Sequence, residues 1–193
     1  MPITLNGTTG EVFPSWTTGT RPASPSAGQT GYNSTLATLE VYNGSSWCPF
    51  SSSTTTPAFG AYAGAGTSVA NSTATKIAFN TSEFDTNSNY STTNSRFTVT
   101  IAGVYQINAA VNFGGYYAYA GVYLYKNGAS FKVGASGGTT NSVAGANYIV
   151  SSLVNLVAGD YIEIWVNQSS GGTITTATGQ ANTYFNGCLV RSA

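Results

Sequence analysis

The chain has 193 residues, of which 41% are hydrophobic and 13% aromatic, so it is long and apolar enough to bury a core. Only 6% of the residues are charged and the formal net charge is zero. A surface of this kind offers few contacts to phosphates, which argues against nucleic acid and anionic membranes as partners. Weak charge repulsion between copies also favours burial of part of the surface in an assembly.

The first part of the chain differs in composition from the rest. All six prolines lie within residues 1–57, which predicts an N-terminal arm over residues 1–56 and a second domain over 57–193. We expect the arm to be extended and broken by turns, because proline fixes its own backbone and restricts the residue before it. The Asn43-Gly44 pair, between residues 39–42 and 45–47, predicts a small β-hairpin at the end of the arm.

Strand patterns dominate the second domain. Apolar side chains alternate with polar ones over residues 96–101 and 105–113, which predicts half-buried strands. Asn127-Gly128 predicts a second hairpin. Residues 148–157 are more continuously apolar, as expected for a strand covered on both faces. Further strands are expected over residues 161–166 and 184–190.

Many short strands with turns between them predict an all-β sandwich of two antiparallel sheets. Composition alone leaves the choice between an immunoglobulin-like topology and a jelly roll open.

The sequence offers little for catalysis or metal binding. It contains no histidine, and acidic residues come close together only at Glu83 with Asp85 and at Asp160 with Glu163. Two carboxylates are enough for a glycosidase, but an Asp after a glycine favours a turn and a mid-strand Glu favours a structural role. We therefore expect no enzyme activity, cofactor or metal. Cys48 and Cys188 are interpreted as small buried hydrophobes rather than a disulfide.

The order of segments in residues 57–193 resembles the globular head of complement C1q and its tumour-necrosis-factor-like relatives. The matching positions are Phe97, Gly103-Val104-Tyr105, Asn127-Gly128, Gly159-Asp160, and Phe185 with Gly187. The resemblance implies a jelly-roll fold, assembly as a homotrimer, and a binding role without catalysis. The chain departs from the family in two ways, since no collagen-like stalk precedes the head and no acidic cluster suggests a calcium site.

A second resemblance concerns the arm. The run from Arg21-Pro22-Ala23 to Tyr32-Asn33, followed by Glu40-Val41-Tyr42-Asn43-Gly44-Ser45-Ser46-Trp47, is similar to a short module that recurs in fibre and virion proteins of tailed phages. The same residues also fit a plain proline-anchored strap and hairpin. The resemblance implies a non-enzymatic phage virion protein, made in the host cytoplasm.

Within that class we expect a capsid decoration, or cement, protein whose arm binds the major capsid protein. The chain is short, starts at its own Met without a visible secretory signal, and encodes no long fibre shaft. Three arms on one trimer would strengthen a weak contact by avidity. The expected capsid-binding residues are the apolar members of the arm: Ile3, Leu5, Val12, Phe13 and Trp16.

The alternative is the receptor-binding tip of a tail or head fibre that recognises a host surface glycan or protein. Tyrosine gives a large amphipathic contact, and the chain is rich in it near residues 116–125. Those tyrosines fit two roles, either a subunit interface or a ligand surface. The expected trimer-interface residues are Tyr105, Tyr123, Tyr125 and Trp165, and the expected ligand-surface residues are Tyr116, Tyr117 and Tyr119.

Overall fold

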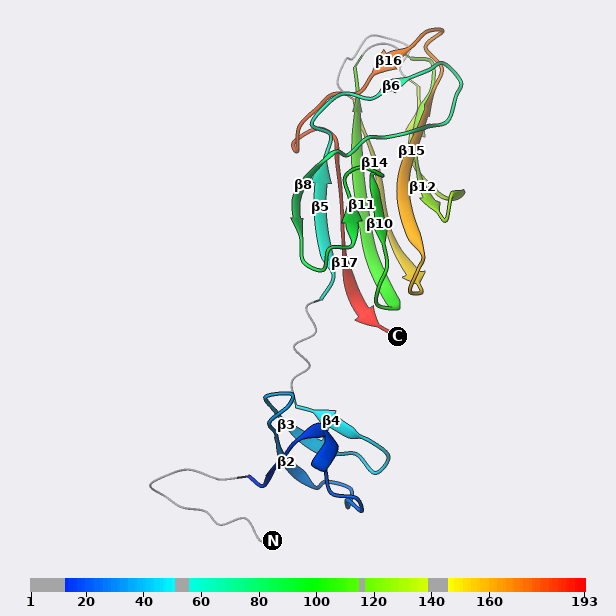
Figure 1. Ribbon diagram of the computed structural model, residues 1–193. Coiled ribbons are helices and arrows are strands. Elements are labelled where there is room, and N and C mark those ends of the chain that lie inside the picture. The colour runs from blue at the N-terminus through cyan, green and yellow to red at the C-terminus, as the bar shows by residue number, and fades with distance from the viewer. Residues whose placement is uncertain (1–12, 51–55, 115–116, 139–145) are drawn as a thin grey trace. The chain divides into compact units, whose positions relative to one another are not determined.

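The computed structural model describes residues 13–50, 56–114, 117–138 and 146–193 (Figure 1). The chain divides into two compact units, Met1–Thr54 and Thr55–Ala193. We call them the N-terminal unit and the head. The sequence had placed this division at residues 56 and 57, where the proline-rich composition ends.

The N-terminal unit is folded into a sheet, whereas the sequence predicted an extended arm for it. Its four strands are in the order β1 (Ser15–Trp16), β2 (Thr30–Asn33), β3 (Thr38–Tyr42) and β4 (Trp47–Pro49), with the 3-10 helix η1 (Thr18–Thr20) after β1. The predicted hairpin is present as β3 and β4, with Tyr42 paired to Trp47. The side-chain oxygen of Asn43 accepts hydrogen bonds from the backbone of Ser45 and Ser46, which closes the turn.

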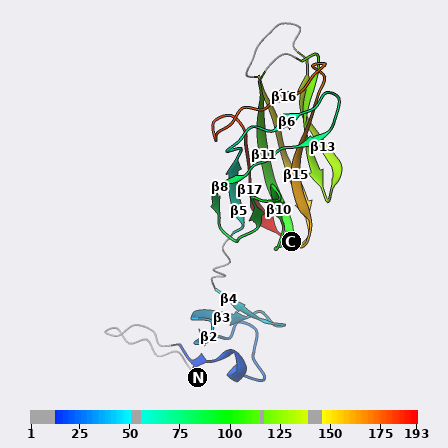
Figure 2. The ribbon, with the colours of Figure 1, turned by 45° about the horizontal axis from the view of Figure 1, so that its top comes forward.

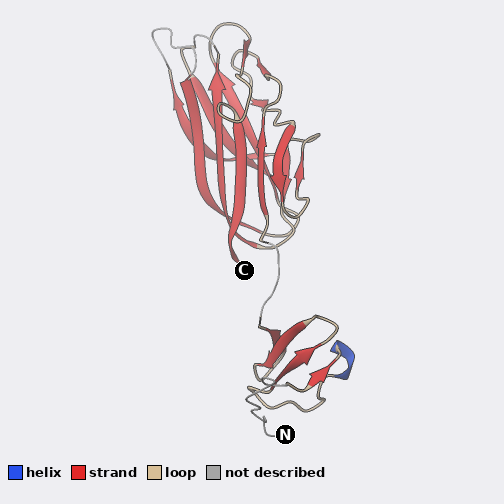
Figure 3. Cartoon of the chain, turned by 90° about the vertical axis from the view of Figure 1, so that its left-hand side faces the viewer, coloured by secondary structure: helices blue, strands red, loops and turns tan. Residues whose placement is uncertain are grey.

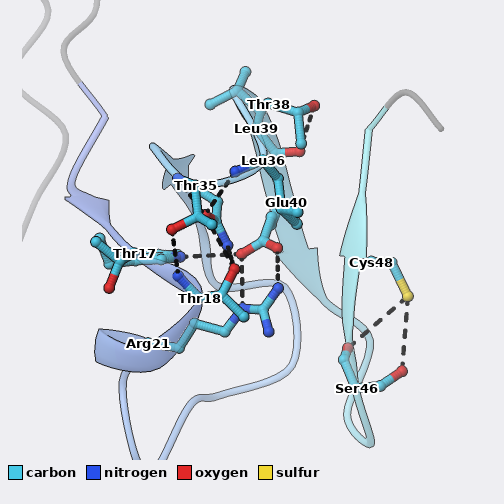
Figure 4. Close-up of polar contacts among 12 residues, drawn as sticks. Thr17, Thr18, Arg21, Thr35, Leu36, Thr38, Leu39, Glu40, Ser46 and Cys48 are labelled. Carbon is cyan, nitrogen blue, oxygen red and sulfur yellow. Dashed lines mark hydrogen bonds and ion pairs between the residues drawn. The ribbon is translucent and has the colours of Figure 1, made fainter. Parts of the chain in front are cut away.

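A buried carboxylate holds the N-terminal unit together. Glu40 is fully buried, and its two oxygens accept hydrogen bonds from the guanidinium of Arg21 (Figure 4) and from Nε1 of Trp16, at 3.1 Å. The ring of Trp16 lies edge-on to Trp47 and against Gly31, where any Cβ would overlap it. The hydrogen bonds from Arg21 lower the pKa of Glu40 to about 2, although burial opposes them.

The head is a sandwich of two antiparallel sheets, which confirms the predicted jelly-roll fold (Figures 1 and 3). The five-stranded sheet has the order β14 (Ala146–Leu156), β11 (Gly103–Phe113), β17 (Tyr184–Ser192), β5 (Ala58–Tyr62) and β8 (Thr81–Asp85). The six-stranded sheet has the order β13 (Ala129–Gly137), β12 (Ala120–Lys126), β15 (Tyr161–Gln168), β10 (Arg96–Thr98) and β9 (Tyr90–Ser91), with β7 (Thr75–Lys76) also paired to β15. Strands β6 (Ser68–Val69) and β16 (Ile174–Thr175) form a small third sheet.

An aromatic cluster joins the two sheets. Phe59 on β5 stacks on Phe97 of β10, with 4.4 Å between ring centroids, and meets the edge of Phe185 on β17. All three side chains are fully buried. Gly187 has no space for a side chain, because a Cβ there would lie 2.8 Å from the backbone oxygen of Gln106. Several of the positions that carried the C1q resemblance are therefore core residues or points of close strand approach.

The alternating patterns were interpreted correctly for β15 and for the first part of β11, two strands that Figure 2 labels. In the second part of β11, Ala110 and Asn112 were expected to face outward, but both are buried. On β15 the side chains of Ile162, Ile164 and Val166 are fully buried, whereas Tyr161 and Trp165 are partly exposed. The hairpin between β12 and β13 turns at Asn127 and Gly128, both at positive φ, as the Asn-Gly pair predicted.

The prediction for residues 148–157 was wrong. Strand β14 is covered on one face only, and its side chains alternate between buried and exposed. Ile149 is 50% exposed and Leu153 56% exposed, so two large apolar side chains of this strand face outward in a single copy of the chain. The outward apolar side chains of β14 therefore form an exposed surface in a single copy of the chain.

We expect the N-terminal unit to be stable at neutral pH and to lose stability in acid. The folded pKa of Glu40 lies below its ordinary value of 4.5, so its stabilisation is complete above about pH 4.5 and is lost as the pH falls toward about 2. Fluorescence of Trp16 and Trp47 in a Trp165→Phe background reports this unit alone. We expect Glu40→Gln to unfold more easily at pH 7 and to lose the acid dependence. A Glu40→Gln variant with the same acid transition would contradict the assignment.

Candidate interaction surfaces

The two sheets of the head present outward faces of different charge. Strands β14, β11 and β5 contain no charged residue, and β17 contains only Arg191, near its end. We call the outward face of these four strands the uncharged face. The neighbouring edge strand β8 carries Glu83 and Asp85. The strands of the other sheet carry Lys76, Arg96, Lys126, Lys132 and Glu163, and we call its outward face the charged face.

The uncharged face carries a network of side-chain amides. Asn108 on β11 accepts hydrogen bonds from Gln106, at 2.9 Å, and from Ser151 of β14, at 2.8 Å. Its own amide donates to Asn186 of β17 at 3.1 Å, so three adjacent strands are linked. The network is polar but carries no ionic charge. Its burial against another protein surface would therefore cost far less than burial of ions.

Exposed apolar side chains lie at both edges of the uncharged face. At one edge are Ile149 and Leu153 of β14. The adjoining strand β13 also exposes Phe131 and Val133, but Val133 is paired with Tyr123 and so lies on the side of the charged face. At the opposite edge is Phe84 of β8, which is 50% exposed and stands between Glu83 and Asp85. The two edges of the uncharged face therefore differ in composition. Exposed apolar patches of this kind are typical of protein interfaces.

The charged face is organised around Glu163 of β15. One carboxylate oxygen accepts hydrogen bonds from Arg96, at 2.8 Å, and from Lys76, at 3.2 Å, and the other accepts from Nε1 of Trp165, at 3.2 Å. Glu163 is buried by these partners, although its side chain lies on the outward side of the sheet. Burial acts to raise the pKa of Glu163, but the hydrogen bonds from Arg96, Trp165 and Lys76 outweigh it and lower the pKa.

Aromatic rings surround this ionic centre. Tyr125 of β12 stacks on Trp165 with 4.8 Å between centroids, and the guanidinium carbon of Arg96 lies 3.7 Å from the centre of the Tyr161 ring. Tyr119 and Tyr123 share a hydrogen bond of 2.6 Å between their hydroxyl groups. Burial, together with the Tyr119 hydroxyl, raises the pKa of Tyr123 to about 12. The hydroxyl of Tyr123 therefore remains neutral at physiological pH.

The expected trimer-interface residues do not form one surface. Tyr105 is fully buried between the sheets, and its hydroxyl donates to the backbone oxygen of Ile101 at 2.6 Å. It has no surface to offer another subunit, so its assignment was wrong. Tyr123, Tyr125 and Trp165 do come together, on the charged face. Nothing in the structure tests their expected role in a trimer interface, and the assembly proposed below uses the uncharged face instead.

The expected ligand-surface tyrosines are also divided. Tyr117 is buried among Phe113 and Tyr148, with ring centroids within 6 Å, so it cannot bind a ligand from solution and its assignment was wrong. Tyr119 is partly exposed and reaches the charged face through Tyr123. Tyr116 lies outside the described residues. Sequence reasoning missed Tyr161 and Arg96 as members of this surface, because their neighbourhood depends on pairing between β10 and β15.

Three of the expected capsid-binding residues, Ile3, Leu5 and Val12, lie outside the described residues. Phe13 is half-buried at the edge of the N-terminal unit. Trp16 is 8% exposed, because it packs on Trp47 and Gly31 inside that unit. Its assignment as a capsid contact was therefore wrong, since a side chain that forms the core of its own unit cannot also bind a partner.

Three of the four acids in the two acidic pairs, Asp85, Asp160 and Glu163, have structural partners. Burial acts to raise the pKa of Asp160, but hydrogen bonds from Lys126, the backbone of Val157 and Asn127 outweigh it and lower the pKa to about 2. Asp85 accepts from the backbone of Asn89 and Tyr90. Within the described ranges, no group of three His, Cys, Asp or Glu side chains is placed to hold a metal.

Both cysteines are free thiols, in different units. The expectation that they are buried was wrong, because Cys48 is partly exposed and Cys188 exposed. Cys188 lies on the uncharged face, across from Gln106. No helix in the described part of the chain is long and apolar enough to cross a membrane.

Comparison with known proteins identifies the family. The C1q domain model matches residues 58–190, more than half of the chain, and the chain therefore belongs to the C1q domain family. Domains of this C1q and tumour-necrosis-factor-like class are typically trimeric binding or structural modules without enzyme activity.

Solved structures share the fold of the head. The globular domain of zebrafish complement 1qA is 18% identical, over 71% of this chain and 99% of that chain, with a TM-score of 0.54. Murine APRIL is 13% identical over 70% and 99%, with a TM-score of 0.56. Eiger TNF from S. frugiperda is 11% identical over 72% and 94%, with a TM-score of 0.57. Among curated proteins, no relative matches the chain.

The Glu163 centre is expected to stabilise the head. Glu163→Gln leaves Arg96 and Lys76 side by side without their shared anion, so we expect a loss of about 3 kcal/mol in the free energy of unfolding. Glu83→Gln removes the same charge from an exposed site on β8 and is expected to cost less than about 0.5 kcal/mol. Urea unfolding followed by circular dichroism measures both. Equal stability of the two variants would argue against the proposed role of Glu163.

Proposed function

We propose that this protein is a homotrimeric, non-enzymatic phage virion protein whose head assembles through the uncharged face. The observation that carries the assembly is the contrast between the two sheets. The uncharged face combines neutral amides with exposed Ile149 and Leu153, whereas the opposite face concentrates the ions of the head. Burial of the uncharged face in an assembly removes apolar area from water without desolvating ions.

The two edges of the uncharged face favour a ring. The β14 edge carries Ile149 and Leu153, whereas the β8 edge carries Phe84 between two acids, so one subunit is expected to place its β14 edge on the β5 and β8 side of the next. Contacts between unlike surfaces are head-to-tail, and they close when the rotation between neighbours divides a full turn. Three copies is the number typical of the family. Low net charge makes such closure favourable, because neighbouring copies do not repel.

The virion role rests on the N-terminal unit. Residues 19–47 resemble a module of tailed-phage fibre and virion proteins, and the structure gives that module its own sheet and its own buried ion pair. A separately folded unit on the same chain as an assembling head suits attachment to a large particle. Within this role we propose capsid decoration, in which three copies of the unit bind the major capsid protein and stabilise the head of the phage. Phe13 and the residues before it remain the proposed contacts.

A second role is favoured by the aromatic rings on the charged face. Assembly through the uncharged face would leave Tyr125, Tyr161 and Trp165 accessible to solvent. A receptor-binding tip of a tail or head fibre would use them to recognise a host surface glycan or protein. The two roles differ in their partner, since decoration requires only the capsid.

The first prediction concerns assembly. We expect the purified protein to have the mass of three chains at micromolar concentration by multi-angle light scattering. The double variant Ile149→Glu with Leu153→Glu places two charges on the uncharged face and is expected to give folded monomers. The matched control, Tyr123→Glu with Tyr125→Glu, places the same charges on the charged face and should remain trimeric. A trimer in the first variant and monomers in the second would reverse the assignment of the faces.

The second prediction concerns the capsid. Purified protein is mixed with phage heads stripped of it, and bound protein is measured together with the temperature of DNA release. We expect saturable binding in multiples of three and a higher release temperature. Deletion of residues 1–12 is expected to abolish binding while the trimer and the sheet of the N-terminal unit persist. Unchanged binding after this deletion would place the contact elsewhere, and no binding by the intact protein would favour the receptor role.

A further inference from the structure

On the outward side of the charged face cations outnumber acids. Lys76 and Arg96 stand there against Glu163, a net charge of +1 on a protein whose formal net charge is zero. Lys126 and Lys132 are paired with the inward-facing Ile162 and Leu124, so they lie on the other side of this sheet. Glu83 and Asp85 lie on β8, in the other sheet. The excess of positive charge is therefore local, and it coincides with the aromatic rings.

The two cations at the centre of this face, Arg96 and Lys76, have N–H groups that their described partners do not use. Arg96 uses Nε and Nη2 on Glu163, and within the described residues Nη1 donates to no partner. The Nζ of Lys76 donates to the backbone oxygen of Asn94 and to Glu163, which leaves one of its three hydrogens. Both side chains are about one third exposed. An anionic group from solution can reach these donors without breaking the buried ion pairs.

The rings beside the cations supply the other half of a site. The stacked pair of Tyr125 and Trp165 stands next to Glu163, and Tyr161 lies under the guanidinium of Arg96. All three rings are partly exposed. A sugar ring has an apolar C–H surface and a rim of hydroxyl groups, and aromatic side chains with a polar tip or neighbour match both. Glu163 holds Arg96, Lys76 and Trp165 in place, so this surface is fixed before a ligand arrives.

We propose that the charged face binds an acidic glycan. In this proposal Arg96 and Lys76 contact a carboxylate or sulfate group of the glycan, and Tyr125, Tyr161 and Trp165 contact the sugar ring. The proposal rests on the receptor-binding role described above and names its ligand class. A net charge of +1 is small for a nucleic-acid site, where many phosphates are neutralised at once. A glycan with one acidic group per repeat needs only one such cluster per subunit.

Assembly would strengthen this contact. Three copies of the face on one trimer can bind successive repeats of the same polymer, which raises the overall affinity without stronger single contacts. A weak site on each subunit is therefore sufficient for firm attachment to a surface coated with acidic polysaccharide.

The test uses the intact trimer at 150 mM NaCl and four acidic polysaccharides: polygalacturonate, alginate, hyaluronate and heparin. Binding is measured by calorimetry and by retardation in native gels that contain the polymer. We expect at least one of the four to bind, and its neutral form, such as methyl-esterified polygalacturonate or desulfated, carboxyl-reduced heparin, to bind at least tenfold more weakly. Failure of all four to bind at millimolar repeat concentration would overturn the proposal. Equal binding of polyaspartate of similar length would overturn it in favour of an acidic protein partner.

Two pairs of variants locate the site. Arg96→Gln and Tyr125→Ala are each expected to weaken binding at least tenfold. Arg191→Gln removes an exposed cation from β17 of the other sheet, and Tyr32→Ala removes an exposed ring from the N-terminal unit, and both should bind within twofold of the parent. Thermal unfolding and mass are measured for each variant. Equal loss of binding in the controls would overturn the proposal. Capsid binding is measured separately with stripped heads, so that failure of the glycan proposal can be distinguished from failure of the virion role.

Discussion

The aromatic contact between Phe59, Phe97 and Phe185 fixes the arrangement on which the other properties of the head depend. It joins β5 and β17 of one sheet to β10 of the other, and the strands that flank it send alternate side chains into the same core. Because successive side chains of a strand point to opposite sides of the sheet, the choice of inward residues also decides what each sheet presents outward. One sheet then presents amides and apolar side chains, and the other presents rings and ions. The proposal that the uncharged face assembles and the charged face binds a ligand follows from this packing.

The chain has few charged residues, and their positions show which contacts depend on ions. The described residues use most of their acids to fix cations or turns: Glu40 holds Arg21 inside the N-terminal unit, Glu163 holds Arg96 and Lys76, and Asp160 holds Lys126 next to a turn. Buried pairs of this type contribute specificity of structure as much as stability. Strands β14, β11 and β5 contain no charged residue, so contact with another copy costs them the least desolvation free energy. Only 6% of the residues are charged, and many of them lie in structural ion pairs. The uncharged face is therefore available for assembly.

Much of the head could be predicted from the sequence, since period-two alternation in β11 and β15 and the Asn127-Gly128 turn are local signals. Burial was predicted less well, because it depends on partners distant in the sequence. Tyr105 and Tyr117 were expected at surfaces, yet strand pairing places them in the core, and Ile149 and Leu153 were expected to be covered, yet β14 is an edge strand of its sheet. In the N-terminal unit the parallel pairing of β1 with β2 encloses Trp16, which no local pattern indicated. The absence of charge along three strands was visible in the sequence and could have identified the uncharged face.

The central claim is that one face of the head is covered by assembly and the other remains open, and thiol accessibility tests it most directly. In a Cys48→Ser background the native Cys188 reports the uncharged face. A Thr98→Cys substitution in a Cys48→Ser, Cys188→Ser background reports the charged face, because Thr98 is partly exposed and is paired with Tyr161. Rates of modification are measured on the assembled protein and on the Ile149→Glu, Leu153→Glu variant. The account predicts that Cys188 reacts much more slowly in the assembly than in the variant, while the cysteine at position 98 reacts at the same rate in both. Equal rates for Cys188, with slowing at position 98, would contradict it.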